Sequence, residues 1–310
     1  MKAVLCTKYG PPDVLKLADI EKPTPGKNEV CIRIHATAVT ASDIFIRSSQ
    51  LPLRFKIPMR LLLGITKPRK PVIGIVLAGE IESAGEQIQR FKPGDQVYGV
   101  TGFNLGAYAE YACMKEKDST RGCLAVKPDN ISYEESTAAA YGGLLALQFA
   151  DKGNIQKGQH VVVYGASGTS GTIALQYAKY LGAEVTGVCS GSHVELVRSL
   201  GADHAIDYTT TDTPPADVRY DFALDAVGKM KSSIFKEALK NELASDGNFA
   251  SIDDGDMKLV SSRLNKVKEL TEAGHIKPII DRTYPLDEIV DAHRYVEKGH
   301  KTGGVAISVV

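Results

Sequence analysis

The 310-residue sequence lacks the charge excess, the long apolar runs and the leader that would assign it to several large protein classes. Its 37 basic and 37 acidic residues balance, whereas nucleic-acid-binding proteins usually carry a basic excess. No stretch approaches the roughly 18 apolar residues that a membrane span needs, and the start lacks the apolar core and cleavage site of a signal peptide. We therefore expect a cytoplasmic protein that binds no nucleic acid and has no transmembrane segment.

Cysteine is scarce as well: the five cysteines are scattered, odd in number and never spaced as CxxC. An odd, dispersed set is typical of reduced thiols rather than of a disulfide framework. No close pair of cysteines or histidines offers the ligand spacing of a zinc site. The sequence therefore predicts no metal.

What the sequence does contain changes character near Lys127-Pro128. The residues before this point form short apolar stretches punctuated by Gly and Pro; residues 30–36, for example, alternate apolar and polar side chains, as a half-buried strand does. This predicts a β-rich, barrel-like unit. The tail from residue 277 returns to short strands, and we expect it to fold back onto that unit.

Between these parts, over residues 127–276, predicted strands alternate with predicted helices. A helix is expected over residues 134–150, with Ser132 as N-cap and Glu135 completing a capping box. Such alternation of strands and helices predicts a parallel sheet. The expected strands are 161–164, 184–189, 204–206 and 222–224, and the expected helices are 169–181 and 194–200.

The segment Gly165-Ala166-Ser167-Gly168-Thr169-Ser170-Gly171 stands between a predicted strand and a predicted helix, which is the context that a dinucleotide-binding motif requires. Gly168 removes the Cβ where a pyrophosphate must approach the backbone, and Gly171 lets the helix pack on the sheet. Free amides at the start of the helix then meet negative charge. A tight turn without a ligand is the alternative for the motif taken alone, but its context favours a cofactor.

Ser190 stands where NAD-preferring proteins place an acidic residue that binds the ribose 2′-hydroxyl, about 20 residues beyond the glycines. A carboxylate there would repel a 2′-phosphate, whereas the hydroxyls of Ser190 and Ser192 and the imidazole of His193 can donate hydrogen bonds to one. The serines could instead cap the next helix, a role that is compatible with phosphate binding. NADPH is therefore the predicted cofactor.

Residues 44–79 contain no acidic side chain but several basic ones. The segment 47–70 is therefore either a basic surface that attracts an anionic substrate, a membrane surface or the phosphates of the cofactor, or it is a solvated loop. Its basic residues are Arg47, Arg54, Lys56, Arg60, Lys67, Arg69 and Lys70.

Modest motifs recur along nearly the whole chain: the apolar run 71–80, the turn and strand 90–99, the segment 106–111, the glycine turn, 200–208 and 277–282. Together and in this order they resemble the medium-chain dehydrogenase/reductase superfamily, and most closely its zinc-free NADPH quinone oxidoreductase branch. The resemblance implies an α/β protein with a GroES-like, β-rich catalytic domain (residues 1–126 and 277–310) and a Rossmann-type, doubly wound parallel-sheet domain (127–276). Substrate is then expected between the two domains, and a homodimer is possible because dimers are usual in the family.

The resemblance also assigns expected cofactor contacts. In the resembling proteins the glycine turn contacts the pyrophosphate, and residues after the next two strands surround the 2′-phosphate. The family often has Lys where this chain has His193, which implies a weaker or pH-sensitive phosphate contact. The expected cofactor-binding residues are Ser167, Gly168, Thr169 and Ser170 at the pyrophosphate, Ser190, His193 and Tyr208 at the 2′-phosphate, and Val227.

Departures from the zinc alcohol dehydrogenase branch set the expected chemistry. That branch has a catalytic Cys three residues before the Asp that matches Asp43, and this chain has Thr40 there. Its GHE motif becomes Gly74-Ile75-Val76, and its third Cys ligand is missing near Tyr141. Without a Lewis acid to polarise an alcohol oxygen, the resemblance implies hydride transfer from NADPH to a quinone or an α,β-unsaturated carbonyl.

Three residues are the candidates for lining the substrate and the nicotinamide ring. Tyr141 matches the segment that lines the ring, although it is alternatively a packed helix residue. Thr40 and Ser42 follow the strand after which family members place substrate-facing groups. Asp43 and Arg47 match a DxxxR pattern that is expected to be structural. The sequence identifies no catalytic acid, so the alternatives are a non-catalytic NADPH-binding sensor or structural protein and a zinc-type alcohol dehydrogenase.

Overall fold

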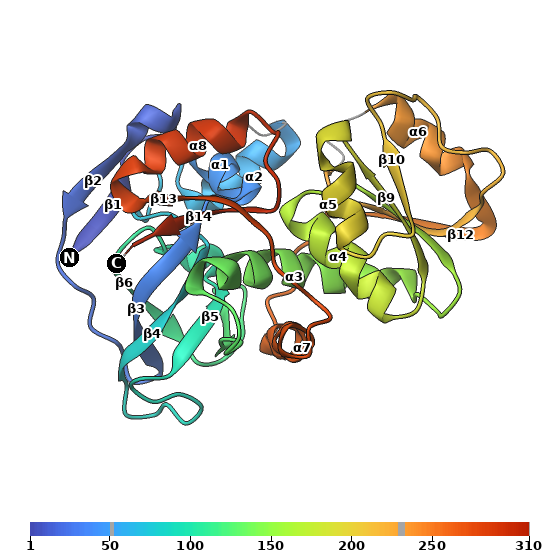
Figure 1. Ribbon diagram of the computed structural model, residues 1–310. Coiled ribbons are helices and arrows are strands. Elements are labelled where there is room, and N and C mark those ends of the chain that lie inside the picture. Colours follow the sequence, from blue (N-terminus) through green and yellow to red (C-terminus); the bar gives the residue numbers. More distant parts are fainter. Residues whose placement is uncertain (50–52, 229–232, 310) are drawn as a thin grey trace. The chain divides into compact units, whose positions relative to one another are not determined.

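The computed structural model describes residues 1–49, 53–228 and 233–309. They form two compact units, which Figure 1 colours along the chain. The first, here called the strand-rich unit, comprises Met1–Ala140, Leu259–Lys268 and Ile280–Val310. The second, the parallel-sheet unit, comprises Tyr141–Lys258 and Glu269–Ile279. The domain limits expected at 126/127 and 276/277 stay predictions.

The strand-rich unit is built on a seven-stranded sheet. Its strands follow the order β13 (Ile280–Pro285), β14 (Gly304–Ser308), β3 (Glu29–Ala38), β4 (Val76–Ala84), β5 (Gln96–Val100) and β7 (Cys123–Val126), with β6 (Tyr111–Lys115) paired to β3. The strands β1 (Lys2–Cys6) and β2 (Leu15–Asp19) form a separate antiparallel pair. Because β14 pairs antiparallel with β3, the tail folds back onto the first part of the chain, as the sequence predicts.

Side-chain alternation along β3 supplies much of the core of this unit. Val30, Ile32 and Ile34 lie on one face, because successive strand residues point to opposite sides, and all three are fully buried. They pack with Leu77 and Val97 of the neighbouring strands in one apolar cluster. The strand predicted from the alternation of residues 30–36 is thus confirmed.

Helices complete the strand-rich unit. The helix α1 (Ala41–Ser48) directly follows β3 and contacts α8 (Ile289–Glu297). The helix α2 (Leu53–Leu63) occupies the middle of the basic segment 47–70, so the interpretation of that segment as a loop is wrong for these residues. Leu, Met, Lys and Arg, which have good helix propensity, make up most of these residues and outweigh Pro58 in the interior of the helix. Short 3₁₀ helices occupy Pro12–Val14, Gly102–Asn104 and Leu286–Glu288.

Five parallel strands form the sheet of the second unit. Their spatial order is β10 (His204–Asp207), β9 (Glu184–Cys189), β8 (His160–Tyr164), β11 (Tyr220–Asp225) and β12 (Leu243–Ser251). Numbered along the chain, this order is 3-2-1-4-5, which is the order of dinucleotide-binding sheets. The predicted α/β fold class with a parallel sheet is confirmed.

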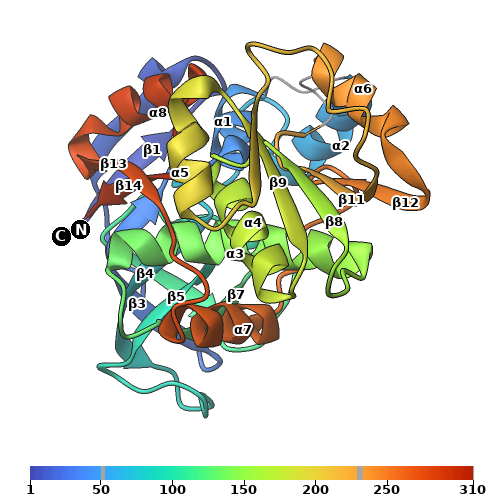
Figure 2. The same ribbon diagram turned by 45° about the vertical axis from the view of Figure 1, so that its right-hand side comes forward.

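Helices cover this sheet, as Figures 1 and 2 show. The helix α4 (Thr169–Tyr180) contacts β8 and β9, α5 (Val194–Ser199) contacts β9 and β10, and α6 (Ile234–Asn241) contacts β12. Residues 161–163 of β8 are all buried, as expected for the central strand of a covered parallel sheet.

Two helices run from one unit into the other along the chain: α3 (Tyr133–Gly153) and α7 (Ser261–Glu272). The start of α3 has the predicted capping box. The Ser132 amide donates to Glu135 Oε2 at 2.8 Å, and the Glu135 amide donates to Ser132 Oγ at 3.1 Å, so each residue satisfies a free amide of the other.

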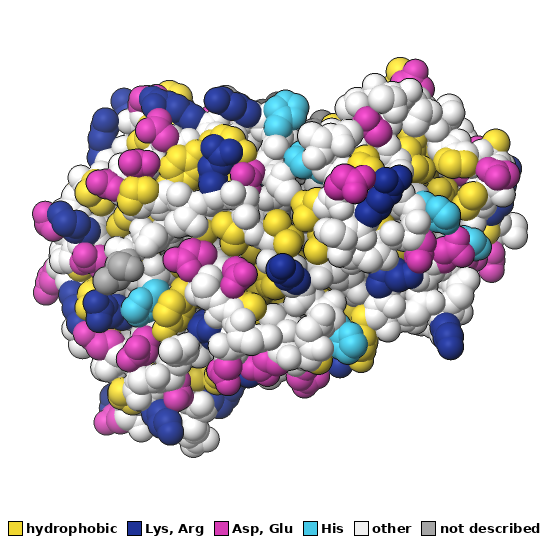
Figure 3. Space-filling model, in the orientation of Figure 1, with side chains coloured by type: hydrophobic (Ala, Val, Ile, Leu, Met, Phe, Trp, Pro, Cys, Tyr) yellow, Lys and Arg dark blue, Asp and Glu magenta, His cyan; other side chains and the backbone are white. Residues whose placement is uncertain are grey.

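Within the described residues, no helix is both long and apolar enough to cross a membrane. On the face of the molecule in Figure 3, basic and acidic side chains are interspersed.

Candidate cofactor and substrate site

The glycine turn follows β8 and leads into α4. Gly165 has φ +80°, a left-handed conformation that favours glycine. A Cβ at Gly165 would lie 2.5 Å from Val227 Cγ2, and one at Gly171 would lie 2.1 Å from the Gly165 carbonyl oxygen. The two glycines therefore let the turn close against Val227 and against the first turn of α4.

Gly168 is the N-cap of α4, so no side chain covers the amides at the start of this 12-residue helix. A Cβ built at Gly168 would meet, among the described atoms, only the Gly165 carbonyl oxygen within 4 Å, at 3.4 Å. The space beside the backbone is thus open. An exposed helix start with open space in front of it suits a phosphate, because the amides point at it and the helix dipole is positive there. This cradle fits the pyrophosphate of a dinucleotide.

The segment after β9 brings together side chains that are predicted to bind the 2′-phosphate. Ser190 Oγ lies 2.9 Å from His193 Nδ1 and 3.4 Å from Ser192 Oγ. A short 3₁₀ helix, Gly191–His193, bends the chain so that these polar groups share one side before α5 begins. They are neutral or cationic donors, which is what a phosphate monoester requires.

Tyr208 joins this group from the neighbouring strand. Asp207, the last residue of β10, is in register with Cys189, and the Tyr208 amide donates to the Cys189 carbonyl at 3.1 Å. Tyr208 therefore follows β10 at the level where Ser190 follows β9. Its ring is 37% exposed and lies 6.0 Å from the ring of Tyr164, so one face remains free to contact a ligand.

Asp207 is a carboxylate that the sequence reasoning did not single out. It accepts hydrogen bonds from the hydroxyl and the amide of Thr209. These bonds, with a further one from the Gly191 amide, hold the pKa of Asp207 below its ordinary value. A Cβ at Gly191 would lie 2.4 Å from Asp207 Oδ2. Asp207 thus ties the ends of β9 and β10 together next to the predicted phosphate site.

A buried ion pair fixes the loop that carries Val227. Asp225, at the end of β11, accepts from the amides of Val227 and Gly228 at 3.0 and 3.1 Å through Oδ1. Its Oδ2 accepts from Ser251 Oγ at 2.9 Å and lies 2.5 Å from Lys236 Nζ. Asp225 and Lys236 are 0% and 3% exposed. Lys236 stands among other charged residues of α6, a pattern that is typical of an exposed helix. The sequence therefore did not indicate that Lys236 is buried and paired.

Lys236 Nζ also donates to the Gly228 carbonyl at 2.8 Å. Both ends of the Val227-Gly228 segment are therefore held by one ion pair. The turn at residues 165–171, Ser190 with His193, Tyr208 and Val227 follow four adjacent strands at their carboxyl ends. This edge of a parallel sheet is where such folds bind dinucleotides.

Tyr141 is half-buried on α3 and belongs to the parallel-sheet unit. The next residue, Gly142, packs against the start of α4: a Cβ there would lie 2.6 Å from the Thr169 carbonyl oxygen. Glycine at this position therefore brings the backbone of α3 close to the phosphate cradle. The structure thus places the backbone next to Tyr141 near the start of α4.

Thr40 is the N-cap of α1 in the strand-rich unit and is 6% exposed. Its Oγ1 donates to Asp43 Oδ2 at 2.6 Å and accepts from the Asp43 amide at 3.3 Å. The hydroxyl is thus committed to a capping box. Ser42, in the first turn of the same helix, is half-buried.

Asp43 itself is completely buried. Burial raises its pKa to about 7, although the hydrogen bonds from Thr40 act in the opposite direction. The carboxyl group therefore gains and loses its proton in a pH range where an ordinary aspartate is fully ionised.

Arg47 organises a second buried group in this unit. Its Nε donates to His293 Nδ1 at 3.3 Å and its Nη1 donates to the Gly10 carbonyl at 2.5 Å, while its Nη2 pairs with Glu297. His293 Nε2 lies 3.1 Å from the Tyr108 hydroxyl. Burial, together with Arg47, lowers the pKa of His293 to about 3, so the imidazole is neutral.

This network fits the structural role expected of Asp43 and Arg47. His293 and Tyr108 were not singled out from the sequence, and only their distant partners could have revealed them. In the described part of the chain, no group of three or more His, Cys, Asp or Glu side chains is arranged to hold a metal ion.

Known families match most of the chain. Residues 26–126 match the alcohol dehydrogenase GroES-like domain, and residues 171–277 and 255–307 match two families described as zinc-binding dehydrogenase. A 2-methylene-furan-3-one reductase of Solanum lycopersicum is 31% identical over 99% of this chain and 79% of its own length. A chloroplastic NADPH-dependent alkenal/one oxidoreductase of Arabidopsis thaliana has the same identity and the same coverage.

Solved structures agree with these matches. The quinone oxidoreductase from Coxiella burnetii superposes with a TM-score of 0.81 at 24% identity, covering 100% of this chain and 99% of that one. At this identity the likeness establishes a shared fold.

Proposed function

Because this chain belongs to the medium-chain dehydrogenase/reductase superfamily, we propose that it is a zinc-independent oxidoreductase that transfers hydride from NADPH to a quinone or an α,β-unsaturated carbonyl. One observation carries the proposal: the open N-terminus of α4 and the Ser190–His193 pair lie along the same edge of one parallel sheet. The names of the curated relatives, an enone reductase and an alkenal oxidoreductase, support the class of acceptor.

Each part of the cofactor has residues suited to hold it. The backbone and hydroxyls of Ser167, Gly168, Thr169 and Ser170 hold the pyrophosphate at the helix start. The hydroxyl of Ser190, the imidazole of His193 and the Tyr208 side chain surround the 2′-phosphate, and Val227 packs against the cofactor on its ion-paired loop. NADPH, when bound, supplies the hydride, and the protein supplies binding and orientation.

The acceptor end uses hydroxyl groups. We propose that Tyr141, Thr40 and Ser42 line the nicotinamide and the substrate. The Thr40 hydroxyl already donates to Asp43, so it would have to exchange that bond to donate to a substrate. Quinones and enones delocalise incoming charge themselves, so orientation by the protein and a weak hydroxyl donor suffice.

The test follows oxidation of the reduced cofactor by its absorbance, with chelator-treated protein and a panel of quinones, enones and simple aldehydes. NADPH and NADH are compared, with Ser190→Asp as the selectivity variant. We expect turnover of quinones or enones, a preference for NADPH, and loss of that preference in the variant. Activity that returns only with zinc would instead support a zinc-type alcohol dehydrogenase. Tight NADPH binding without turnover of any acceptor would support a non-catalytic sensor or structural protein.

The proposal extends to partners and compartment. Ile57, Leu61 and Ile65 on and after α2 are 57%, 58% and 61% exposed in a segment rich in basic residues, which supports peripheral contact of segment 47–70 with an anionic membrane surface. Sedimentation with anionic and with neutral vesicles tests this. The free state of the five cysteines supports a reducing, cytoplasmic setting. A homodimer, usual in the family, is tested by light scattering.

A further inference from the structure

Two strands of the strand-rich unit place two cysteines directly opposite each other. In the antiparallel ladder between β3 and β6, Cys31 is in register with Cys113. Residues paired in this way point to the same face of the sheet, with Cα atoms about 4.5 or 5.5 Å apart. A disulfide needs Cα atoms about 4.4–6.8 Å apart, so the register permits one without movement of the backbone.

The two thiols already interact. Cys31 and Cys113 share a hydrogen bond, and this bond lowers the pKa of Cys31, while the pKa of Cys113 is raised. Cys31 Sγ also lies 3.8 Å from the Pro23 carbonyl oxygen and 3.7 Å from Glu82 Oε2. Because the thiolate is the nucleophilic form of a cysteine, Cys31 is the better nucleophile of the two.

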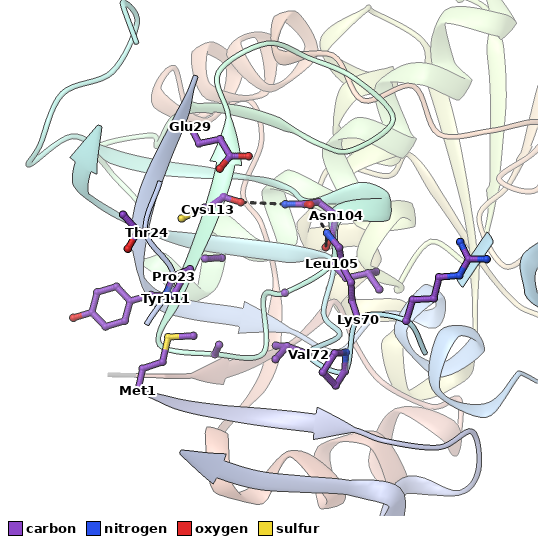
Figure 4. A pocket seen from close by; sticks show the side chains of 15 residues that line it. Met1, Pro23, Thr24, Glu29, Lys70, Val72, Asn104, Leu105, Tyr111 and Cys113 are labelled. Carbon is purple, nitrogen blue, oxygen red and sulfur yellow. Dashed lines mark hydrogen bonds between the residues drawn. The ribbon is translucent and has the colours of Figure 1, made fainter. Parts of the chain in front are cut away.

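Access to the pair comes from a cavity of about 450 Å³ in the strand-rich unit. Cys113 is half-buried and lines this cavity, whereas Cys31 is buried behind it. Figure 4 shows Cys113 among the lining side chains, with its carbonyl oxygen accepting from Asn104 Nδ2 at 3.0 Å. The other side chains around the cysteine end of the cavity are Met1, Pro23, Thr24, Glu29 and Tyr111.

The remaining cysteines differ from this pair in both respects. Cys6, Cys123 and Cys189 are buried, and burial raises their pKa values to about 11, 12 and 11. In the strand registers of the described chain, none of them stands opposite another cysteine. They supply internal controls for any reaction of the pair.

We propose that Cys31 and Cys113 form a second redox site, separate from the cofactor site, that closes to an intramolecular disulfide when a peroxide enters the cavity. One thiol loses its proton, the thiolate attacks a peroxide oxygen and the O–O bond breaks; the leaving hydroxide takes up that proton, so a sulfenic acid and one water form. The second thiol then attacks that sulfur, the S–O bond breaks, and a second water leaves. In total, two thiols are oxidised by two electrons and one hydrogen peroxide is reduced to two waters.

The experiment uses the full chain, reduced and then freed of reductant. Hydrogen peroxide is added, remaining thiols are alkylated, and the protein is digested without reduction for mass spectrometry. We expect a disulfide-linked pair of peptides containing Cys31 and Cys113 to form at least ten times faster than any oxidation of the other three cysteines. Dithiothreitol should reverse the link. The wild-type protein alone decides the matter, so the result does not depend on whether a variant folds.

Matched variants sharpen the result. Cys123→Ser, which removes a buried thiol elsewhere, should leave the link unchanged. Cys31→Ser should abolish it, and Cys113→Ser should abolish it and leave Cys31 as a sulfenic acid that dimedone traps. The proposal is overturned if native protein shows both thiols still separately alkylated after peroxide. It is equally overturned if either cysteine stops at the sulfenic acid in the wild type, or if the link forms only after urea unfolds the chain. NADPH oxidation, followed in parallel, tests the cofactor site independently.

Discussion

The parallel-sheet unit and the strand-rich unit assemble their polar groups in different ways. In the parallel-sheet unit the groups follow successive strands, and Ser190 meets His193 only three positions along the chain. In the strand-rich unit Arg47 meets His293, 246 positions away. The arrangement in the parallel-sheet unit can therefore be recognised in short sequence motifs. The arrangement in the strand-rich unit forms only when α8 packs near α1.

This difference separates residues that are placed to bind a ligand from residues that stabilise the fold. The groups of the parallel-sheet unit lie at strand ends, half-exposed, where a ligand can reach them. In the strand-rich unit, the buried side chains of Arg47, His293 and Tyr108 bind one another. The exception in the parallel-sheet unit is the pair of Asp225 and Lys236, which is buried like the Arg47 group although the two residues stand closer together in the sequence. Variants of these groups test whether the distinction holds.

Removing the Arg47 guanidinium should have the largest effect. Arg47→Met leaves Glu297 without its cation and the Gly10 carbonyl without its donor, and breaking a buried pair costs about 3–5 kcal/mol of unfolding free energy. Urea denaturation measures the loss. As a control, Arg198→Met removes a side chain that is 56% exposed and should change little. Equal losses for both variants would contradict a supporting role for the Arg47 group.

Lys236→Met should come next. It leaves Asp225 charged and buried, at a cost of about 3 kcal/mol, and it releases the Gly228 carbonyl that Lys236 holds. We therefore expect weaker NADPH binding as well as lower stability, measured by calorimetry and urea denaturation. Lys240→Met, on an exposed pair of the same helix, is the matched control. A variant that is destabilised but binds NADPH as the wild type does would show that the ion pair does not position Val227.

Two groups of the strand-rich unit should give opposite pH dependences. The pKa of Asp43 is about 7 in the folded chain, above its ordinary 3.8. The folded state then binds more protons, and the unfolding free energy falls as the pH rises from about 4 to about 7. The pKa of His293 is about 3, below its ordinary 6.5. The folded state binds fewer protons there, and the unfolding free energy rises with pH over about 3 to 6.5.

In the wild type the two contributions offset each other between about pH 4 and pH 6.5. In Asp43→Asn only the contribution of His293 should remain, so that the unfolding free energy rises with pH by up to about 1.4 kcal/mol per pH unit. His293→Gln should uncover the opposite slope. Urea denaturation across this range measures both, and two variants with the slope of the wild type would refute the assignment.

The smallest effect concerns the residues of the parallel-sheet unit that are predicted to bind the 2′-phosphate. His193→Lys places a permanent cation beside Ser190 and should strengthen NADPH binding by about 1 kcal/mol, without changing NADH binding. Calorimetric titration with both cofactors measures this. His204→Lys, at the amino end of β10, adds the same side chain at the opposite edge of the sheet. If His204→Lys strengthened NADPH binding equally, the gain would come from the added positive charge of the protein and not from a contact with the 2′-phosphate.

The sequence predicted the first four strands of the parallel-sheet unit closely, but it did not predict β12 or α6. The strand at 184–189 has the observed bounds, the helix expected at 169–181 is observed as Thr169–Tyr180, and the capping box of Ser132 and Glu135 is present. These features depend on residues within a few positions of one another, where propensity, capping and glycine placement act together.

The partners of buried side chains on other elements could not be predicted from the sequence. Lys236 stands in a charged helix and Cys113 in a short strand, and neither position shows its partner until the strand order and the register are known. The helix α2 was missed because its basic residues resemble a solvated segment. Register is set by which face of a strand is buried, and that depends on the whole sheet.

The pairing of β14 with β3 has a consequence for synthesis of the chain. Residues 306–308 lie beside residues 36–38, so the sheet that contains β3 lacks a strand until these later residues have been synthesised. The parallel-sheet unit, which ends at Ile279, needs none of those residues. We expect the parallel-sheet unit to reach protease resistance on ribosomes stalled once residue 279 has emerged, whereas the strand-rich unit becomes resistant only once residues 304–308 have emerged as well.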